Sequence, residues 1–385
     1  MKKIALLVFS AVLVATVSCT QENASEANFA GIEVEVGEKN GSFSKLYVLN
    51  EGAFPGASTL DLLDFKKKTY CADIFGQANP EVPQGIGNTG NDMAVVNGRL
   101  WVLMNASNQV AVLHLPDAKL ERVLDVDSPR FIVQDGDYAY ISSYAGAVYG
   151  GEEAVPGKVY RIHAKTFESS SIEVGYQPEG LAVWDGNLYV ANSGGYNWVH
   201  DNRISVINLK TFLMDGHVTA PVTNLFQLYA ASGKLWFSSY GESTWSQDAD
   251  GNWIQSVSAP QSLTSMTTSG VSQFEVRPEI HMNRMTLAGN TLVGFGNDAE
   301  MTGGYDPCLY KVNTSNGVYS KTRFADTDLS RIGYPYGILV NPENGDIYIC
   351  DASFTAGSKL HCFDSALKHK WTVDTGVGTG HLLLQ

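Results

Sequence analysis

The chain has 385 residues, of which 44% are hydrophobic and 17% are charged, so it is long enough to bury a sizeable core. Its 40 acidic and 26 basic residues give a formal net charge of −14. That balance argues against a nucleic-acid partner, because contacts to phosphate groups require basic patches.

The N-terminal segment has the pattern of a bacterial lipoprotein signal. Two lysines follow Met1, an apolar run covers residues 4–17, and Cys19 stands at the expected cleavage point. The apolar run is shorter than a membrane span. We therefore expect residues 1–18 to be a signal peptide, and acylated Cys19 to anchor the protein without crossing the membrane. The segment 19–42 then serves as a flexible tether. A plain signal peptide with a chance cysteine is the alternative.

Cleavage of this signal would leave four cysteines, Cys71, Cys308, Cys350 and Cys362. They could form disulfides in three ways, and the sequence does not choose between them. None of them has the CxxC spacing of a zinc site. We expect them to be core or cross-strand cysteines.

A hairpin pattern repeats along the chain. In residues 177–193 (QPEGLAVWDGNLYVANS), two strands joined by an Asp-Gly turn lie between polar ends. The pair Asp185-Gly186 favours a two-residue hairpin turn, in which both positions need a positive φ. A third strand follows each hairpin, as at 203–207. The pattern recurs over residues 90–107, 128–144, 222–240, 281–298 and 334–353.

The two ends of the chain supply a seventh unit. Residues 45–52 (KLYVLNEG) resemble a second strand without a first, and residues 379–385 (TGHLLLQ) resemble a first strand without a second. The sequence therefore predicts an all-β, seven-bladed β-propeller over residues 43–385, with its last blade closed by strands from both termini. A many-stranded β-sandwich is the alternative, but sandwiches lack a regular period of this length.

In a propeller, the innermost strand of each blade starts at one face, and the second strand returns to that face. The residues that open the first strands should therefore ring the central opening, and the loops after the second strands should surround them. Loops on a rigid scaffold often carry function. The predicted ring residues are Asp92, Arg130, Glu179, Asn224, Asn283 or Arg284, Tyr336 and His381.

The segment 239–270 is predicted to be the longest of these loops, and it contains Trp245 and Trp253. Loops of this length are usually functional or disordered. The two tryptophans either meet a partner or pack on the base of the loop.

The loops of this face are rich in aromatic residues and amides. Flat rings together with Asn, Ser and Gly suit a large, flat, neutral ligand with many amide groups. Sugars are the competing ligand class, because aromatic platforms and amide hydrogen bonds serve them equally well. The aromatic residues are Tyr144, Tyr149, Tyr196, Trp198, Tyr240, Trp245, Trp253 and Phe354.

Enzyme motifs give little support for catalysis. The stretch GIGNTG at 85–90 fits GxGxxG, but a strand follows it where a dinucleotide site needs a helix. The sequence contains no HExxH, GxSxG or Walker A motif. Oxygen ligands for Ca²⁺, as in propeller lactonases, could come from Asp92, Glu179, Asn224 and Asn283. Arg130 and Arg284 enter the same ring and would repel a cation, so we predict no catalytic residue and no bound metal.

Several motifs are specific enough to suggest a family. They are VGYQPEGLAVWDGNLYVANSGGY (174–196), DNRISVINLKTF (201–212), PYGILVNPENGDIYICDA (335–352) and KLHCFDSALKHKWTVDTG (359–376). They resemble the seven-bladed surface lipoproteins that bind vitamin B12 (cobalamin) and cap the TonB-dependent B12 transporter in the outer membrane of gut anaerobes. The resemblance covers most of the mature chain. Thr379-Gly380 is a departure, because the family tends to have a proline there.

The resemblance implies a protein that is lipid-anchored in the outer membrane and faces the cell exterior. Such a protein captures cobalamin and passes it to a TonB-dependent transporter, with no catalysis and no cofactor. The motif positions add Tyr176, Asn192 and Asp351 to the predicted ligand-binding residues. The alternative hypotheses are a glycan- or nutrient-binding propeller, an adhesion disc, and a metal-dependent lactonase-like hydrolase.

Overall fold

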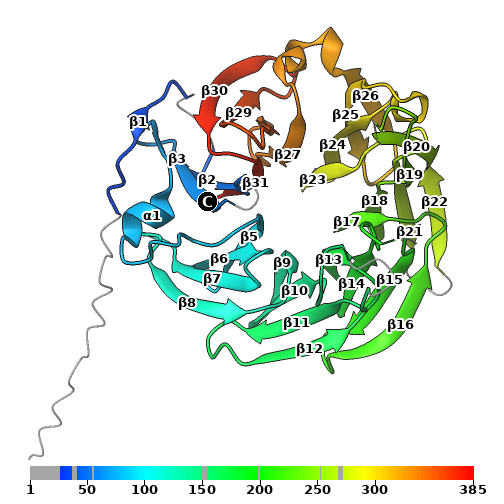
Figure 1. The fold of residues 1–385 in the computed structure, drawn as a ribbon, viewed down its shortest axis with the longest axis horizontal. Coiled ribbons are helices and arrows are strands. Elements are labelled where there is room, and N and C mark those ends of the chain that lie inside the picture. Colours follow the sequence, from blue (N-terminus) through cyan, green and yellow to red (C-terminus); the bar gives the residue numbers. More distant parts are fainter. Residues whose placement is uncertain are drawn as a thin grey trace, which may run out of the picture.

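The computed structural model describes residues 27–36, 41–53, 56–149, 154–197, 200–251, 253–267 and 272–385. In this part of the chain, seven antiparallel sheets stand like blades around a central axis (Figure 1). Each blade contains four strands that follow one another from the axis outward, and blade 1 carries a short fifth strand at its outer edge. The predicted all-β, seven-bladed propeller is therefore confirmed.

Six blades are built from consecutive stretches of chain, with the inner strand first. Blade 2 contains β5 (Gly90–Val96), β6 (Arg99–Met104), β7 (Gln109–His114) and β8 (Leu120–Asp125). Blade 3 contains β9 (Pro129–Asp135), β10 (Tyr138–Ser143), β11 (Lys158–His163) and β12 (Ser169–Glu173). Blade 4 contains β13 (Pro178–Trp184), β14 (Asn187–Asn192), β15 (Arg203–Asn208) and β16 (Leu213–Thr219).

The next three blades follow the same order. Blade 5 contains β17 (Leu225–Ala231), β18 (Lys234–Ser239), β21 (Ser262–Thr267) and β22 (Gln273–Arg277). Blade 6 contains β23 (Arg284–Ala288), β24 (Thr291–Asn297), β25 (Pro307–Asn313) and β26 (Tyr319–Arg323). Blade 7 contains β27 (Pro335–Val340), β28 (Ile347–Asp351), β29 (Ser358–Phe363) and β30 (His369–Thr375).

Blade 1 closes the ring with strands from both ends of the chain, as predicted. Its inner strand is β31 (Thr379–Leu384), which pairs with β2 (Lys45–Asn50). Outside these lie β3 (Thr59–Asp64), β4 (Thr69–Cys71) and the short β1 (Ile32–Glu33). The backbone amides of Ser44 and Lys45 both donate to the carbonyl of Gln385, at 2.8 and 2.9 Å. The last residue of the chain is thus part of the closure.

Short helical turns connect some of the strands. They are α1 (Ile74–Ala78), η2 (Glu300–Thr302), η3 (Phe324–Asp326) and η4 (Asp328–Arg331). No helix among the described residues has the length and apolarity to cross a membrane.

The hydrophobic core lies between neighbouring blades. For example, Trp101 and Leu103 of blade 2 pack with Ile132 and Ile141 of blade 3. Full burial of such a side chain contributes about 1.5–3 kcal/mol, or more for Trp. Each of the second strands contributes a buried aromatic residue, which makes the repeat visible in the sequence: Tyr47, Trp101, Tyr140, Tyr189, Trp236, Phe295 and Tyr348.

The hairpin turns have the geometry that their sequence predicts. Trp184 pairs with Asn187 across a two-residue turn, in which Asp185 has φ 49° and Gly186 has φ 75°. A second glycine, Gly180, allows a close approach of neighbouring inner strands. A Cβ atom at this position would lie 2.7 Å from the backbone nitrogen of Leu228.

The segment 239–270 is not one long loop, and this prediction was wrong. Residues Ser262–Thr267 form β21, the third strand of blade 5, with Leu263 and Met266 buried. The residues before it form a separate hairpin of β19 (Glu242–Gln247) and β20 (Trp253–Ala259). In the strands of this hairpin, Ser and Thr residues stand between larger side chains, a pattern that a strand accommodates. Asp250-Gly251 lies in the turn between them, with Gly251 at φ 81°.

Part of the N-terminal segment belongs to blade 1. Ile32 of β1 pairs with Tyr70 of β4, so part of the predicted tether 19–42 packs on the outer edge of blade 1.

All four described cysteines are buried free thiols. Cys350 and Cys362 lie on adjacent strands, but each pairs with a different residue of the other strand.

Candidate functional site

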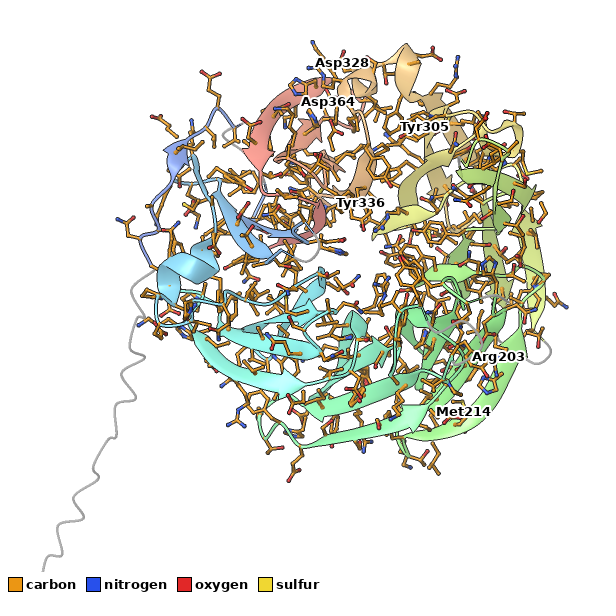
Figure 2. The ribbon with its side chains drawn as sticks, in the orientation of Figure 1. Arg203, Met214, Tyr305, Asp328, Tyr336 and Asp364 are labelled. Atoms are coloured by element: carbon orange, nitrogen blue, oxygen red, sulfur yellow. The ribbon has the colours of Figure 1, made fainter. Side chains whose placement is uncertain are left out.

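A bowl-shaped cavity of about 1140 Å³ lies on the face where the inner strands begin. The loops after the second strands of all seven blades contribute to its wall. Figure 2 shows one lining residue, Tyr336, beside the central opening, whereas Arg203 and Met214 lie in the outer part of blade 4. We refer to this cavity as the bowl.

Irregular strand pairing directs side chains into the bowl. In six of the seven blades, the register between the first two strands shifts near the start of the inner strand. Such β-bulges insert an extra residue and re-aim its side chain. In β5 the extra residue is Asn91, which lines the bowl, while Asp92 lines the channel below it. The equivalent shifts in other blades fall at Arg130, Glu179, Phe226, Tyr336 and Gly380.

Nine of the sixteen residues predicted to bind ligand line the bowl. They are Arg130, Glu179, Tyr196, Asn224, Tyr240, Arg284, Tyr336, Phe354 and His381. They come from six blades. In the remaining blade 2, the predicted residue Asp92 lies in a narrower channel below the bowl.

Glu179 and Arg130 form a buried ion pair on the floor of the bowl. Arg130 donates from Nε to Glu179 Oε2 at 2.9 Å and from Nη2 to Oε1 at 3.2 Å. The hydroxyl of Tyr144 also donates to Glu179, and the Arg130 guanidinium lies 4.8 Å from the Tyr144 ring centre. Burial opposes the charge on Arg130, but Glu179 raises the pKa of Arg130 well above its usual value. Arg130 and Glu179 thus place opposite formal charges in direct contact on the floor.

Three groups of aromatic rings surround this pair. Tyr149 and Tyr196 meet edge to face at 5.2 Å. Phe226 contacts Tyr240 at 4.7 Å and Phe131 at 5.6 Å. The third group contains Tyr334, Tyr336 and Phe354, with Tyr336 and Phe354 perpendicular at 5.2 Å. Flat apolar surfaces thus cover much of the floor and wall, as a ligand with planar apolar faces requires.

Arg284 lies between two of these groups. Its guanidinium is 4.0 Å from the ring centre of Tyr336 and 5.3 Å from that of Phe226. Burial disfavours the charged form, but Tyr240, Tyr336 and Glu51 raise the pKa of Arg284 above its usual value. Arg284 is a permanent cation held by cation–π contacts.

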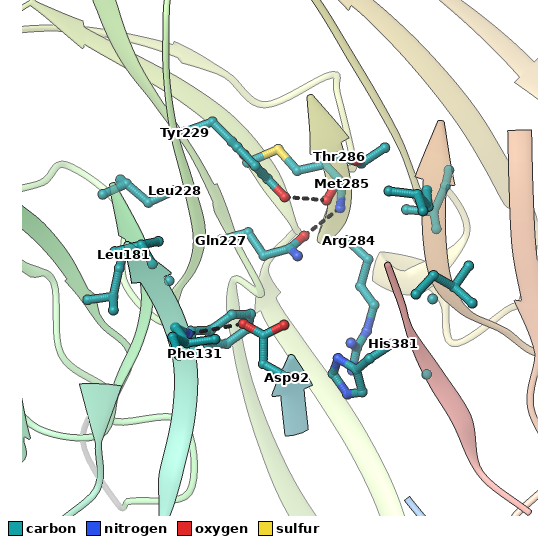
Figure 3. Close-up of a pocket in the computed structure, with 18 of the residues that line it drawn as sticks. Asp92, Phe131, Leu181, Gln227, Leu228, Tyr229, Arg284, Met285, Thr286 and His381 are labelled. Atoms are coloured by element: carbon teal, nitrogen blue, oxygen red, sulfur yellow. Dashed lines mark hydrogen bonds between the residues drawn. The ribbon is translucent and has the colours of Figure 1, made fainter. Parts of the chain in front are cut away.

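A narrower channel of about 220 Å³ continues along the axis below the bowl. Figure 3 shows Arg284 and His381 projecting into this space, with Asp92 facing them from β5. Burial raises the pKa of Asp92 to about 6, although His381 and two backbone amides act against this shift. Glu51 and His381 approach to 3.4 Å. Burial would raise the pKa of Glu51, but the contact with His381 lowers it overall.

Besides Asp92, four predicted residues lie outside the lining of the bowl. Tyr144 is buried beneath it and supports Glu179. Asn192 is fully buried and holds the backbone at Gly175 and Arg203. Asp351 accepts a hydrogen bond from the amide of Tyr334 at 2.7 Å, and Tyr334 in turn lines the bowl. The fourth, Tyr176, packs against Arg203 outside the cavity.

Three predicted positions cannot be placed. Cys19 and Trp198 lie outside the described residues. Trp245 belongs to β19, but the position of its side chain is not described.

The bowl also contains residues that were not predicted from the sequence. They are Asn91, Phe131, Phe226 and Tyr334. Phe131 directly follows a predicted ring position and Asn91 directly precedes one, so a one-residue shift from each bulge would have identified them. Such bulges are not visible in the hydrophobic pattern.

The oxygen side chains considered as Ca²⁺ ligands are not arranged as a metal site in the part of the chain that the structure describes. Glu179 is occupied by Arg130 and Tyr144. No group of three or more His, Cys, Asp or Glu side chains among the described residues is arranged to hold a metal ion.

Comparisons with known proteins support the fold alone. No family model matches the chain, and none of the curated proteins does. A mutant of Synechocystis apocarotenoid oxygenase has a TM-score of 0.56 at 10% identity, covering 89% of this chain and 92% of its own. Kuenenia stuttgartiensis hydrazine synthase has a TM-score of 0.55 at 15% identity, covering 75% of this chain and 87% of its own. Apo AztD from Citrobacter koseri reaches 0.50 at 10% identity, covering 89% and 97%. Proteins this distant share the scaffold without sharing a function.

Proposed function

We propose that this protein is a cell-surface lipoprotein that captures cobalamin and passes it to an outer-membrane TonB-dependent transporter. The observation that carries this proposal is the bowl. Its volume of about 1140 Å³ exceeds the range of about 300–1000 Å³ that is typical of pockets for drug-sized ligands. A corrinoid is a ligand of the larger class.

The chemistry of the bowl supports the same ligand. A corrinoid has a broad planar ring whose edge carries amide side chains. The aromatic groups around Tyr196, Phe226 and Tyr336 can cover the faces of such a ring. Asn108, Asn224 and Ser243 on the rim can hydrogen-bond to the amides.

The proposed location depends on the N-terminal signal and on Cys19. An acylated Cys19 would hold the propeller at the membrane surface. The wide mouth of the bowl leaves the ligand open to a partner on one side, which suits transfer to a transporter. Membrane attachment is tested by labelling with a radioactive fatty acid, which should mark the wild type and leave Cys19→Ala unmarked.

The ligand is tested by calorimetric titration with cyanocobalamin. A soluble form beginning at Thr20 contains every described strand. One-to-one binding that is unaffected by a chelator would support the proposal. No heat of binding at micromolar protein would refute cobalamin capture.

A glycan is the second candidate ligand, because the same rings and amides suit sugars. A panel of oligosaccharides titrated in the same way distinguishes the two. Saturable binding of a glycan, with none of cyanocobalamin, would favour this alternative. For a metal-dependent hydrolase we find no supporting arrangement in the described residues, since Glu179 is engaged by Arg130.

A further inference from the structure

The two arginines of the bowl floor, Arg130 and Arg284, differ in whether an acidic side chain contacts them. Arg130 is neutralised by Glu179 in a two-point ion pair. Arg284 contacts the rings of Tyr336 and Phe226, but among the described residues it makes no ion pair and no hydrogen bond to an acceptor. The neighbouring acid, Glu51, lies 3.4 Å from His381, and its charge acts on Arg284 without a direct contact. Among the described residues, Arg284 is therefore the arginine of the floor that lacks a direct ion-pair partner.

The position of Arg284 makes this charge available to a ligand. It lines both the bowl and the channel, so it lies where the two cavities join (Figure 3). The rings of Tyr336 and Phe226 lie against the guanidinium, at 4.0 and 5.3 Å from its central carbon. A stacked guanidinium keeps its N–H groups free to donate sideways, because the rings occupy its faces.

An uncompensated charge in a partly enclosed site is costly unless it acquires a partner. A guanidinium fork matches the two oxygens of a phosphate or carboxylate, and such charge-assisted hydrogen bonds are among the stronger ones in proteins. The site is thus prepared for an anionic group that enters with the ligand.

We propose that Arg284 is the recognition point for a phosphate group carried by the ligand of the bowl. This proposal rests on the proposed function for the identity of the ligand. Cobalamin carries one phosphodiester, in its nucleotide loop, on a periphery that otherwise consists of neutral amides. The bowl correspondingly presents one unpaired arginine, Arg284, on a floor whose other arginine is already neutralised. The phosphodiester would bind at the mouth of the channel while the corrin ring contacts the aromatic wall.

The experiment compares two corrinoids on the soluble form beginning at Thr20. Cyanocobalamin contains the phosphodiester, and dicyanocobinamide lacks the nucleotide loop. Arg284→Gln removes the charge, and Arg284→Lys keeps the charge but loses the fork. Arg161→Gln is the matched control, because Arg161 also lies between two rings, Tyr138 and Phe212, on the outer part of blade 3.

We expect Arg284→Gln to weaken cyanocobalamin binding about 10- to 100-fold, the loss expected for charge-assisted hydrogen bonds. The affinity for dicyanocobinamide should change by less than about threefold. Arg284→Lys should fall between the wild type and the Gln variant, and Arg161→Gln should match the wild type for both ligands. Equal weakening of both corrinoids by Arg284→Gln, or no weakening of cyanocobalamin, would overturn the proposal. Thermal unfolding midpoints identify any variant that fails to fold.

A third titration separates this proposal from the proposed function. If the wild type binds neither corrinoid, cobalamin capture is refuted, and phenyl phosphate then tests the site directly with phenol as its control. Saturable binding of phenyl phosphate that Arg284→Gln and not Arg161→Gln abolishes would support a phosphate site for a different ligand. Absence of that difference would refute the site.

Discussion

Replacing Glu179 by Gln should destabilise the propeller by about 3–5 kcal/mol, because it leaves a buried charge without its partner. The Glu179 side chain is 5% exposed and that of Arg130 is 14% exposed. Gln retains the shape of Glu179 but removes the negative charge. The remaining neighbours of Arg130 are the Asn91 carbonyl oxygen at 2.8 Å and the Tyr144 ring at 4.8 Å, and neither carries a full charge.

An exposed ion pair provides the matched control for this prediction. Lys359 and Asp374 are in contact, but their side chains are 53% and 83% exposed. Pairs of this kind contribute about 0–1 kcal/mol. Asp374→Asn should therefore change the free energy of unfolding by less than about 1 kcal/mol. The comparison separates loss of a charge from loss of a buried partner.

Guanidinium chloride unfolding of the soluble form, followed by circular dichroism and by fluorescence, measures both effects. The variants Glu179→Gln, Arg130→Met and their combination form a double-mutant cycle. The combined variant should lose less stability than the sum of the two single variants, because it removes both charges. If Glu179→Gln costs no more than Asp374→Asn, the pair is effectively solvated and the reasoning from burial fails.

Four further predictions concern a close approach of two strands, an exposed ring of the bowl, a buried acid and the removal of metal. Gly180→Val should lower the thermal midpoint by several degrees, because a Cβ atom would lie 2.7 Å from the Leu228 nitrogen; an unchanged midpoint would contradict this close approach. Tyr149→Ala should leave the midpoint nearly unchanged, because Tyr149 is 80% exposed, but should weaken cyanocobalamin binding in calorimetry; equal affinity would remove Tyr149 from the site. Asp92 has its pKa raised to about 6 by burial, so its contribution to stability is present below about pH 4 and is lost as the pH rises through about 6. The loss relative to Asp92→Asn is at most about 3 kcal/mol, and unfolding curves for both proteins that run parallel from pH 4 to 8 would contradict it. Dialysis against EDTA should change neither the thermal midpoint nor the titration with cyanocobalamin, and a shift in either would indicate a structural or ligand-binding metal.

The propeller was predictable because its blades repeat a chemical pattern with a visible period. Asp185-Gly186 required positive φ at both positions, and the structure has that turn. The terminal strands matched the halves of one hairpin, so closure between residues 45–50 and 379–384 followed from comparison with the other blades. The error at 239–270 arose because Ser and Thr were taken as loop residues, although they stand beside Leu263 and Met266 in a buried strand.

The bowl was only partly predictable because its lining depends on local backbone irregularities. The sequence placed Asp92 on the floor, but the extra residue in β5 brings Asn91 there and turns Asp92 toward the channel. Asn192 has the polar character of a binding residue, yet its side-chain amide accepts from the Gly175 amide and donates to the Arg203 carbonyl. Composition alone does not distinguish an amide that faces a ligand from one that supports a loop.

The scaffold and the floor of the bowl are subject to separate physical constraints. The blades require second strands that are buried on both faces, and structures at 10–15% identity share the fold. The floor positions arise where six inner strands depart from regular pairing. Their side chains contact one another across blades, as Arg130 and Glu179 do, but they lie outside the hydrophobic clusters between blades. In blade 6 the pairing is regular from Arg284 onward, and this residue presents a charge without a direct ion-pair partner. Ligand preference can therefore change at the floor while the ring is preserved, which is why the ligand must be inferred from the floor and tested there.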